Sequence, residues 1–419
     1  MLRDTDVLSL LMRRIPAHSL AQDLYCDPGS FAVDMAEIWY KEWIFAALSC
    51  EMAKAGEYVV HDLGSYSVVI VRGNDGEIRA FHNACRHRGS VLCTAKKGRG
   101  PKLVCPYHQW TYELDGSLLW ARDMGPDFDP KSHGLKSVHC RNVSGMIYIC
   151  LAEEAPDFAE FEAETARYLQ LHDLENSKVA FESTIVERGN WKLVWENNRE
   201  CYHCSGNHPS LCRTFPEDPR AIGNDETGEF SDLLEQHIER CASVGALAAY
   251  KEAALGDWRY VRTPLLGTAE SYTLDGKVAS TRPNSTIPFK NAGSLLKFKY
   301  PGCWNHFLSD HSIVFRVTPI SATETEVCTK WLVHKDAEEG VNYDLQRLTE
   351  VWIATNDEDR EVVENNQRGI LSPAYEPGPY SPIHEGGNIQ FTEWYTSTMI
   401  RALTGPTRSA RRNYSTAAE

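Results

Sequence analysis

Two groups of residues in this 419-residue chain have the types and spacing of metal ligands. The later group runs from Glu200 to His208 and contains a carboxylate and two imidazoles, His203 and His208. If residues 191–203 are helical, Glu200 and His203 share a face, whereas His203 and His208 would splay by roughly 140° on a regular helix. We expect Gly206 to turn the chain so that both imidazoles reach one point. Two histidines held in this way suit a divalent transition metal.

An earlier pair of short motifs offers a second set of ligands. Cys85-Arg86-His87 is followed, after seventeen residues, by Cys105-Pro106-Tyr107-His108. Two thiolates and two imidazoles could hold a structural zinc ion. They could also hold a two-iron, two-sulfur cluster, with the cysteines on one iron and the histidines on the other. Because each motif gives one ligand of each kind, like ligands can segregate by iron, and this favours the cluster over zinc.

The composition argues against several classes of partner. The chain is 42% hydrophobic and 24% charged, as in ordinary soluble proteins, and its formal net charge is −15. An acidic protein suits neither nucleic acid nor an anionic membrane, since both attract a basic face. No apolar run approaches the length of a membrane span, and the N-terminus lacks the pattern of a secretory signal. The 13 cysteines then predict reduced thiols in a cytoplasmic protein.

The pattern of apolar and polar residues changes along the chain. Residues up to about Tyr40 carry apolar side chains at helical spacing. From 43 to about 152, short strand-like runs alternate with turn signals, which predicts a small antiparallel β domain. Within it, Asp115-Gly116 is expected to link 111–114 to 118–120 as a hairpin.

The second half of the chain mixes strands and helices. After an acidic connector, predicted to be helical from 153 to about 174, strands are predicted over 180–186, 312–317 and 326–333. A long helix is predicted over roughly 345–369. Because strands and helices do not alternate strictly, the pattern indicates an α+β domain.

Together, the two ligand groups resemble the motifs of the Rieske non-haem iron oxygenases. Residues 85–87 and 105–108 resemble the Rieske motif, and the order acidic residue, two residues, His, four residues, His in 200–208 resembles the mononuclear iron motif. The resemblance covers nearly the whole chain. An electron carrier or a zinc-stabilised binding module would require the second motif to be accidental.

The resemblance implies a fold and three regions. A helical segment (1–42) would pack on the catalytic domain, and a small antiparallel β Rieske domain (43–154) would follow. The catalytic domain (155–419) would be α+β, with an antiparallel sheet and long helices of the helix-grip type.

The resemblance also implies cofactors. A [2Fe-2S] cluster and a mononuclear Fe(II) are expected, and the iron takes two histidines and one carboxylate from a late helix, with open positions for oxygen. The implied ligands of the cluster are Cys85, His87, Cys105 and His108. The implied histidine ligands of the iron are His203 and His208.

Helical periodicity selects the carboxylate from Asp357, Glu358 and Asp359. Asp359 shares a helix face with the apolar residues around it, whereas Asp357 faces the opposite side and Glu358 lies off the stripe, where a carboxylate is usually solvated. The apolar residues of that face are Leu348, Trp352, Val363 and Ile370. We therefore expect Asp359 to be the third ligand.

Glu200 stands where the family most often has aspartate. The resemblance implies that this residue is a bridge for electrons rather than a ligand, joining an iron-bound histidine to a histidine of a neighbouring chain's cluster. It thereby implies a ring of subunits, usually a homotrimer. Glutamate at this place, within the run 197–204, resembles the subgroup that acts on carnitine and other betaines. Cys201 and Cys204, which flank His203, are expected to be small packing residues.

Resemblance to the betaine demethylases implies the reaction. The chain would be the oxygenase component of a monooxygenase that converts glycine betaine to dimethylglycine and formaldehyde, using O2 and NADH-derived electrons from a separate flavin and iron–sulfur reductase. Proline betaine (stachydrine) is the next candidate substrate, and carnitine, choline or an aromatic ring are further alternatives. Because a quaternary ammonium has no hydrogen to donate, aromatic faces are expected to bind it. The candidates are Trp304, Phe307 and Trp331.

Basic residues surround the cluster motifs in an otherwise acidic chain. This basic rim consists of Arg86, Arg88, Lys96, Lys97, Arg99 and Lys102. It could dock an acidic reductase, or its members could be solvated loop charges.

Overall fold

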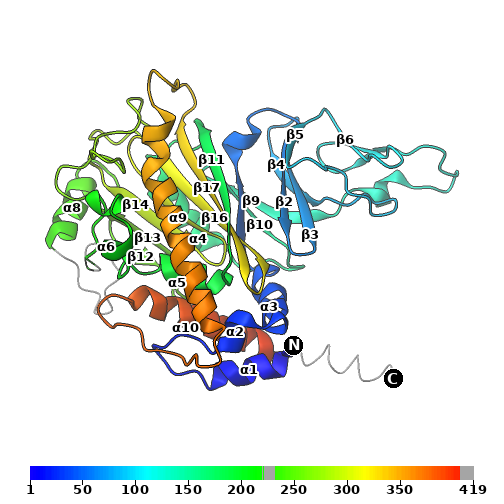
Figure 1. Cartoon of the computed structure of the whole chain (residues 1–419). Helices are drawn as coiled ribbons and strands as arrows, with labels where there is room; N and C mark the ends of the chain where they lie inside the picture. Colours follow the sequence, from blue (N-terminus) through cyan, green and yellow to red (C-terminus); the bar gives the residue numbers. More distant parts are fainter. Residues whose placement is uncertain (219, 221–231, 406–419) are drawn as a thin grey trace. The chain divides into compact units, whose positions relative to one another are not determined.

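The computed structural model describes residues 1–218, 220 and 232–405, and the chain divides into two compact units (Figure 1). The smaller unit is Lys41–Val179, and the larger unit combines Met1–Tyr40 with the described part of Ala180–Glu419. The contacts of the segment 155–179, which we expect in the catalytic domain, group it with the smaller unit, and the domain boundary at 154 stays a prediction. The reason is aromatic packing, since the rings of Phe158 and Phe161 lie 5.5 and 5.2 Å from the ring of Tyr148.

Antiparallel sheets form the smaller unit, as the sequence predicts. The larger sheet has seven strands in the order β1-β10-β9-β4-β3-β2-β5, and a three-stranded sheet has the order β6-β7-β8. The strands are β1 (Ile44–Leu48), β2 (Glu57–Leu63), β3 (Tyr66–Arg72), β4 (Ile78–His82), β5 (Lys97–Arg99), β6 (Leu103–Val104), β7 (Thr111–Tyr112), β8 (Leu118–Trp120), β9 (Ser137–Val143) and β10 (Met146–Cys150). Helix α4 (Ala159–Leu169) confirms the helical connector.

The predicted hairpin is formed by β7 and β8. Tyr112 pairs with Leu118, and Gly116 between the two strands has a φ of +87°, which favours glycine. The turn therefore follows from the Asp115-Gly116 sequence.

The larger unit contains a second seven-stranded sheet, in the order β11-β17-β16-β15-β14-β13-β12. Its strands are β11 (Ser177–Glu187), β12 (Lys251–Glu252), β13 (Trp258–Thr263), β14 (Ser294–Lys299), β15 (Cys303–Phe307), β16 (Ser312–Ser321) and β17 (Glu324–His334). The neighbouring strands from β12 to β17 pair antiparallel. The three strands predicted in this half lie in β11, β16 and β17, and the α+β class is confirmed.

The strand register aligns four large side chains in one row across this sheet. Arg259 on β13 pairs with Phe298 on β14, Phe298 pairs with Trp304 on β15, and Trp304 pairs with Phe315 on β16. Directly opposed residues of neighbouring strands share a face of the sheet. One cation and three aromatic rings therefore form a continuous row on one face.

Long helices cover the face that carries this row. Helix α9 (Leu345–Ile370), drawn in orange in Figure 1, confirms the predicted long helix, and its Trp352 ring lies 5.1 Å from the ring of Phe315. Helix α5 (Trp191–Asn198) packs against α9 and against β16 and β17. The other α-helices in the described part of this unit are α1 (Asp4–Met12), α2 (Gln22–Cys26), α3 (Pro28–Asp34), α6 (Cys204–Asn207), α8 (Asp232–Ala242) and α10 (Gly386–Thr404).

A buried ion pair connects the N-terminal segment to α5. Lys192 on α5 and Asp34 on α3 form an ion pair, and both side chains are fully buried. The Asp34 carboxylate also accepts hydrogen bonds from Trp191 Nε1 (3.0 Å) and Tyr395 Oη (2.7 Å). Charge pairing and hydrogen bonding thereby join three segments that are far apart in the sequence.

Helix α5 ends five residues before the point we predicted. It stops at Asn198, and Arg199 is its C-cap, so the expected helix over 191–203 is wrong at its end. The turn at Gly206 is also wrong, because Gly206 lies inside α6, and His203 and His208 are the N-cap and C-cap of that short helix. The chain changes direction between α5 and α6, and this break brings the two imidazoles together.

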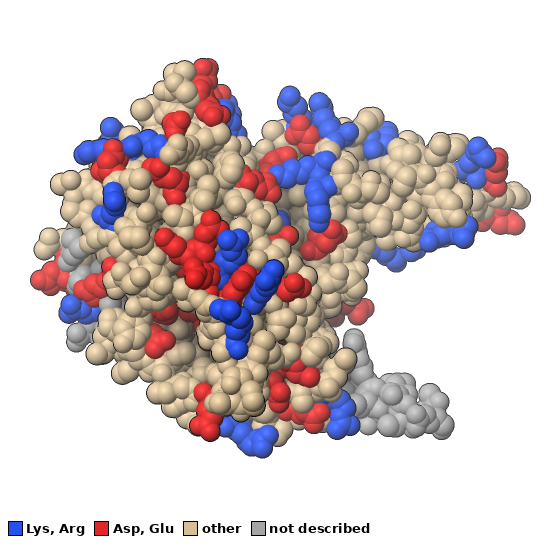
Figure 2. All heavy atoms as spheres, viewed as in Figure 1, with Lys and Arg blue, Asp and Glu red and all other residues tan. Residues whose placement is uncertain are grey.

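No helix in the described part of the chain is both long and apolar enough to cross a membrane. On the face drawn in Figure 2, Lys and Arg side chains are interspersed with Asp and Glu.

Candidate metal centres and substrate cavity

Two loops of the smaller unit present the four predicted cluster ligands. In the first, the Cys85 amide donates to the Ser90 carbonyl (2.8 Å), and in the second, the Cys105 amide donates to the Trp110 carbonyl (2.9 Å). The rings of His87 and His108 lie 4.7 Å apart. Matching loops therefore place like ligands side by side.

The cysteines and histidines of these loops have different environments. Cys85 and Cys105 are buried, at 3% and 1% exposure, whereas His87 and His108 are exposed. The Tyr112 hydroxyl oxygen accepts a hydrogen bond from the Arg86 amide (2.9 Å). The hydroxyl proton of Tyr112 is then available for Cys85 Sγ, which lies 3.3 Å away. The donor set fits a cluster with a buried thiolate-bound iron and an outer histidine-bound iron.

Carboxylates neutralise much of the basic rim. Lys96 pairs with Asp62 (2.6 Å) and Lys97 pairs with Glu51 (2.9 Å). Lys102 forms an ion pair with Glu113. The rim therefore carries less net positive charge than its sequence suggests, and reductase docking there stays a prediction.

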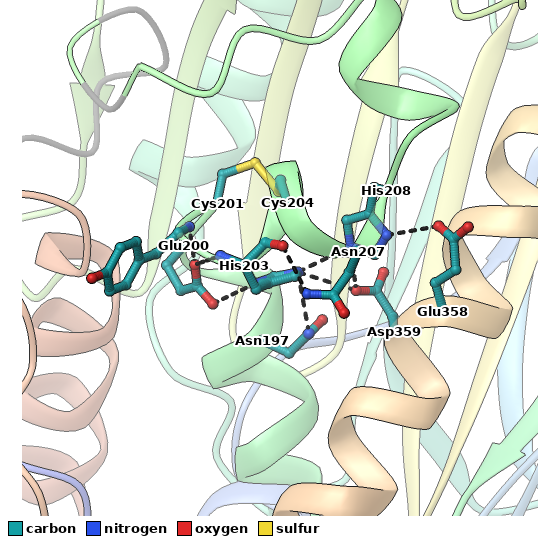
Figure 3. Close-up of a disulfide and its surroundings, with 10 residues drawn as sticks. Asn197, Glu200, Cys201, His203, Cys204, Asn207, His208, Glu358 and Asp359 are labelled. Carbon is teal, nitrogen blue, oxygen red and sulfur yellow. Dashed lines mark hydrogen bonds and ion pairs between the residues drawn. A yellow bond between two sulfur atoms is a disulfide. The ribbon is translucent and has the colours of Figure 1, made fainter.

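In the larger unit, three predicted iron ligands converge (Figure 3). His203 Nε2 lies 3.0 Å from His208 Nε2, and Asp359 Oδ1 lies 3.3 and 3.0 Å from these two nitrogens. Ligand atoms bound about 2.1 Å from one ion at right angles would lie about 3.0 Å from each other. The three distances therefore match one face of an octahedral site.

Carboxylates fix the proton positions of both imidazoles. His203 Nδ1 donates to Glu200 Oε1 (2.5 Å), and His208 Nδ1 donates to Glu358 Oε2 (2.9 Å). An ionised carboxylate only accepts, so the protons of neutral imidazoles lie on Nδ1 and both Nε2 lone pairs point toward Asp359. Asp359 Oδ1 is buried and has no hydrogen-bond partner in the structure. Three electron pairs directed at one point require a cation, so these residues fit the iron.

The electrostatics of this centre favour positive charge. Burial lowers the pKa of His203, but the neighbouring carboxylates of Asp359 and Glu200 outweigh it and raise that pKa to about 10. Burial raises the pKa of Asp359, but the neighbouring imidazoles of His203 and His208 outweigh it and lower that pKa. A divalent cation would replace protons as the source of this charge.

The prediction for Glu358 is wrong. We expected a solvated charge, but Glu358 accepts the hydrogen bond from His208, and Asp357 is the exposed carboxylate that pairs with Arg360. Glu358 reaches the site because it lies next to Asp359 on α9. Its adjacency to a predicted ligand was the one signal in the sequence.

Cys201 and Cys204 form a disulfide, which corrects the expectation that all cysteines are reduced and that this pair serves only for packing. Their separation of three residues brings the two sulfurs together at the break between α5 and α6. Cys204 Sγ also lies near the ligand nitrogens of His203 and His208. The bond closes a small ring that includes His203.

A cavity of about 90 Å³ opens beside this centre. Its walls contain His203, His208 and Asp359 as well as aromatic side chains from the sheet and helices. A space of this size is several times what one water molecule needs, so a small organic molecule can enter it.

The three aromatic candidates have different positions relative to this cavity. Trp304 lines it, whereas Phe307 and Trp331 are fully buried and are absent from its lining in the described part of the chain. By strand alternation, Phe307 faces the side of the sheet opposite to Trp304. The sequence prediction missed the aromatic residues Phe215, Phe298 and Trp352, which also line the cavity.

Comparison with known proteins identifies the class. Residues 42–139 match the Rieske [2Fe-2S] domain, and residues 174–400 match the ring hydroxylating alpha subunit (catalytic domain). The chain belongs to this family of Rieske non-haem iron oxygenases, and it uses a [2Fe-2S] cluster and non-haem iron.

Individual proteins of this family are similar to the chain over different lengths. The chain is 48% identical to the glycine betaine monooxygenase oxygenase subunit of Pseudomonas aeruginosa over 403 residues, covering 94% of this chain and 92% of the relative. It is 33% identical to the carnitine monooxygenase oxygenase subunit of Escherichia coli over 202 residues, covering 46% of this chain and 53% of the relative. A crystal structure of the quaternary ammonium Rieske monooxygenase CntA has a similar fold, with a TM-score of 0.72 at 21% identity, covering 93% of this chain and 98% of CntA.

Proposed function

We propose that this chain is the oxygenase component of a monooxygenase that removes one methyl group from glycine betaine. The observation that carries the proposal is the convergence of His203, His208 and Asp359 on the wall of a cavity with aromatic side chains. Identity of 48% across 94% of the chain to a glycine betaine monooxygenase subunit supports this substrate.

The side chains of the two sites take separate roles. Cys85, His87, Cys105 and His108 would hold the cluster, and His203, His208 and Asp359 would hold the iron. Glu200 orients His203 through Nδ1, and Glu358 orients His208 in the same way. When bound, the iron supplies the activation of O2.

The net chemistry follows from the substrate. One oxygen atom is inserted into a C–H bond of an N-methyl group, and the other leaves as water after taking up two electrons from NADH and two protons. The N-hydroxymethyl ammonium then releases its hydroxyl proton and formaldehyde and leaves dimethylglycine, because the cationic nitrogen is a good leaving group. Exclusion of water by the aromatic walls would protect the reaction from side products.

We further propose a ring of subunits, in which Glu200 connects the iron of one chain with the cluster of its neighbour. The hydrogen bond from His203 to Glu200 is the half of this bridge within one chain. A separate flavin and iron–sulfur reductase would supply the electrons. In solution, light scattering of the intact protein should give the mass of a trimer, and a monomer would contradict the bridge.

A panel of substrates tests the reaction. The protein is incubated with NADH, a surrogate reductase and each of glycine betaine, proline betaine, carnitine and choline, and formaldehyde is measured. We expect the highest rate with glycine betaine. Formaldehyde from proline betaine alone would reassign the substrate, and turnover of an arene without formaldehyde from any betaine would contradict the proposal.

A further inference from the structure

Two buried arginines lie in the wall of the cavity that contains the iron ligands. Arg199 and Arg259 both line it, and only 2% and 4% of their surfaces are exposed. Arg199 is the C-cap of α5, next to Glu200, and Arg259 lies on β13. Arginine is rarely buried in a protein without an anion or other acceptors to hold it.

The two guanidinium groups lie close together. Arg199 Cζ is 4.1 Å and Arg259 Cζ is 5.4 Å from the centre of the Phe298 ring. Burial and the charge of Arg199 lower the pKa of Arg259 to about 10. Positive charge is therefore concentrated at this part of the wall, and an anion in the cavity would relieve the repulsion.

Both side chains contact further protein groups, but Arg199 Nε and Arg259 Nε are buried without a hydrogen-bond partner in the described part of the chain. Arg199 donates to Gln390 Oε1 (2.7 Å), and Gln390 Nε2 donates to Glu252 Oε2 (2.7 Å). The Arg259 guanidinium lies 5.7 Å from the ring of Tyr250, whose hydroxyl also donates to Glu252. The carboxylate reached through these contacts is that of Glu252, which is exposed.

The rest of the cavity suits a cation without hydrogen-bond donors. Trp304, Trp352 and Phe215 keep 9%, 6% and 8% of their surfaces exposed, and all three line the cavity. The carboxylates in its described lining are Glu200 and Asp359, at the iron site. The lining of the cavity therefore contains aromatic, acidic and guanidinium groups together.

The sheet register sets the spacing between these groups. Arg259 and Trp304 flank Phe298 on neighbouring strands, so their backbones lie about 10 Å apart. Both residues line the same cavity. A small zwitterion can therefore reach both.

Lys297 is a weaker candidate for the anion-binding residue. It also lines the cavity, but it pairs with Asn305 across the strands, and its Nζ lies 3.9 Å from Cys303 Sγ. Strand alternation directs its side chain to the face opposite to Phe298 and Trp304.

From this arrangement we infer that Arg259, supported by Arg199, binds the carboxylate of the substrate while Trp304, Trp352 and Phe215 contact its ammonium group. The inference rests on the proposed function and names the feature that selects a betaine over choline. Arg259 is thus a specificity-determining residue, and it holds an N-methyl group toward the iron ligands by fixing the opposite end of the molecule.

The test compares ligands that differ in their negative charge. Binding of glycine betaine and of choline to the oxidised holoprotein is measured by calorimetry, and kcat and KM are measured for both. Variants are Arg259→Gln, Arg259→Lys and the control Arg262→Gln. Arg262 is a buried arginine on the same strand that does not line the cavity within the described part of the chain.

We expect Arg259→Gln to raise the Kd for glycine betaine roughly 30-fold or more, because a charged partner of the carboxylate is lost. The Kd for choline should change less than about threefold, since choline has no carboxylate to lose a partner. Arg259→Lys should recover part of the affinity, and Arg262→Gln should keep the wild-type preference for glycine betaine.

Two failures are distinguishable. If the wild-type protein produces formaldehyde from glycine betaine but Arg259→Gln binds both ligands as the wild type does, the arginines have a structural role only and the inference is wrong. Equal weakening for both ligands, with a lowered melting temperature, would also overturn it. If the wild-type protein produces no formaldehyde from any betaine, the proposed function itself fails.

Discussion

Glu200 and Glu358 each contact the Nδ1 atom of one histidine of the proposed iron site. Each accepts a hydrogen bond from Nδ1 of one histidine, at 2.5 and 2.9 Å. This contact fixes the tautomer and leaves Nε2 for the metal. The two carboxylates lie on different segments, since Glu200 precedes α6 and Glu358 lies on α9. We therefore expect different effects when each glutamate is replaced.

Replacement of Glu200 by Gln should stop turnover and leave both metal centres in place. The amide can still contact His203, but it loses the charge of the proposed bridge. Iron content and the electron paramagnetic resonance signal of the reduced cluster should equal those of the wild type. The reduced cluster should fail to reoxidise when substrate and O2 are added, whereas wild-type turnover in this variant would refute the bridge.

Replacement of Glu358 by Ala should weaken iron binding by about 10- to 100-fold, since it removes the hydrogen bond that orients His208. Iron loss to a competing chelator measures the change. Asp357→Ala is the matched control, because Asp357 is the exposed neighbour that pairs with Arg360. Equal iron loss from both variants would contradict a specific role for Glu358.

At the scale of elements, the position of the site depends on how α5 is held. Its Lys192 is buried against Asp34 of α3, and Asp34 also accepts from Trp191 and Tyr395. Burial lowers the pKa of Lys192, and the Asp34 carboxylate opposes this effect. The N-terminal segment is thereby fixed to the helix that precedes the iron ligands.

Lys192→Met should lower the free energy of unfolding of this unit by about 3–5 kcal/mol, because Asp34 then keeps a buried charge without its cation. The midpoint of thermal or urea unfolding measures this loss. The double variant Lys192→Met/Asp34→Asn should recover part of it, since the charge is gone. An unchanged midpoint in the single variant would show that the pair does not hold α5.

The sequence predicted the elements better than the junctions between them. Alternation and helical periodicity found β11, β16, β17 and α9, because each has one buried face. The same periodicity selected Asp359, whose oxygen meets both histidine nitrogens. These features depend on local patterns that the sequence shows directly.

The features that the sequence missed depend on contacts between distant segments. Helix α5 ends at Asn198, and Glu358 contacts His208, because of the way in which α5, α6 and α9 pack together. Hydrophobic periodicity within one segment does not show contacts between segments. The disulfide between Cys201 and Cys204 had a signal in its spacing, but the spacing alone also fitted two packing residues. The row from Arg259 to Phe315 required the strand register.

At the scale of the whole molecule, we expect the carboxylates at and near the proposed iron site to lower the free energy of unfolding of the protein. Glu187, at the end of β11, is 4% exposed, and its Oε2 is buried without a hydrogen-bond partner. Burial, and then the charges of Asp359 and Glu364, raise the pKa of Glu187 to about 8. The folded protein therefore holds this proton more tightly than the unfolded chain does.

This raised pKa predicts that stability falls with rising pH. Between the ordinary glutamate value and pH 8 the unfolded chain releases the proton first, so Glu187 destabilises the fold by up to about 1.4 kcal/mol per pH unit. Glu187→Gln should remove that slope, and the gain in melting temperature should be larger at pH 8 than at pH 5. Parallel pH profiles for the variant and the wild type would contradict the assignment.

The central claim is that the two metal centres of this chain demethylate glycine betaine, and a single-turnover measurement tests it without any reductase. The holoprotein is reduced chemically, freed of reductant, and mixed with glycine betaine and O2, and formaldehyde and dimethylglycine are quantified against active sites. We expect the two products to form in equal amounts, in proportion to the iron sites, and the Rieske clusters to oxidise at the same time. Oxidation of the clusters without formaldehyde or dimethylglycine would contradict demethylation of glycine betaine by this chain.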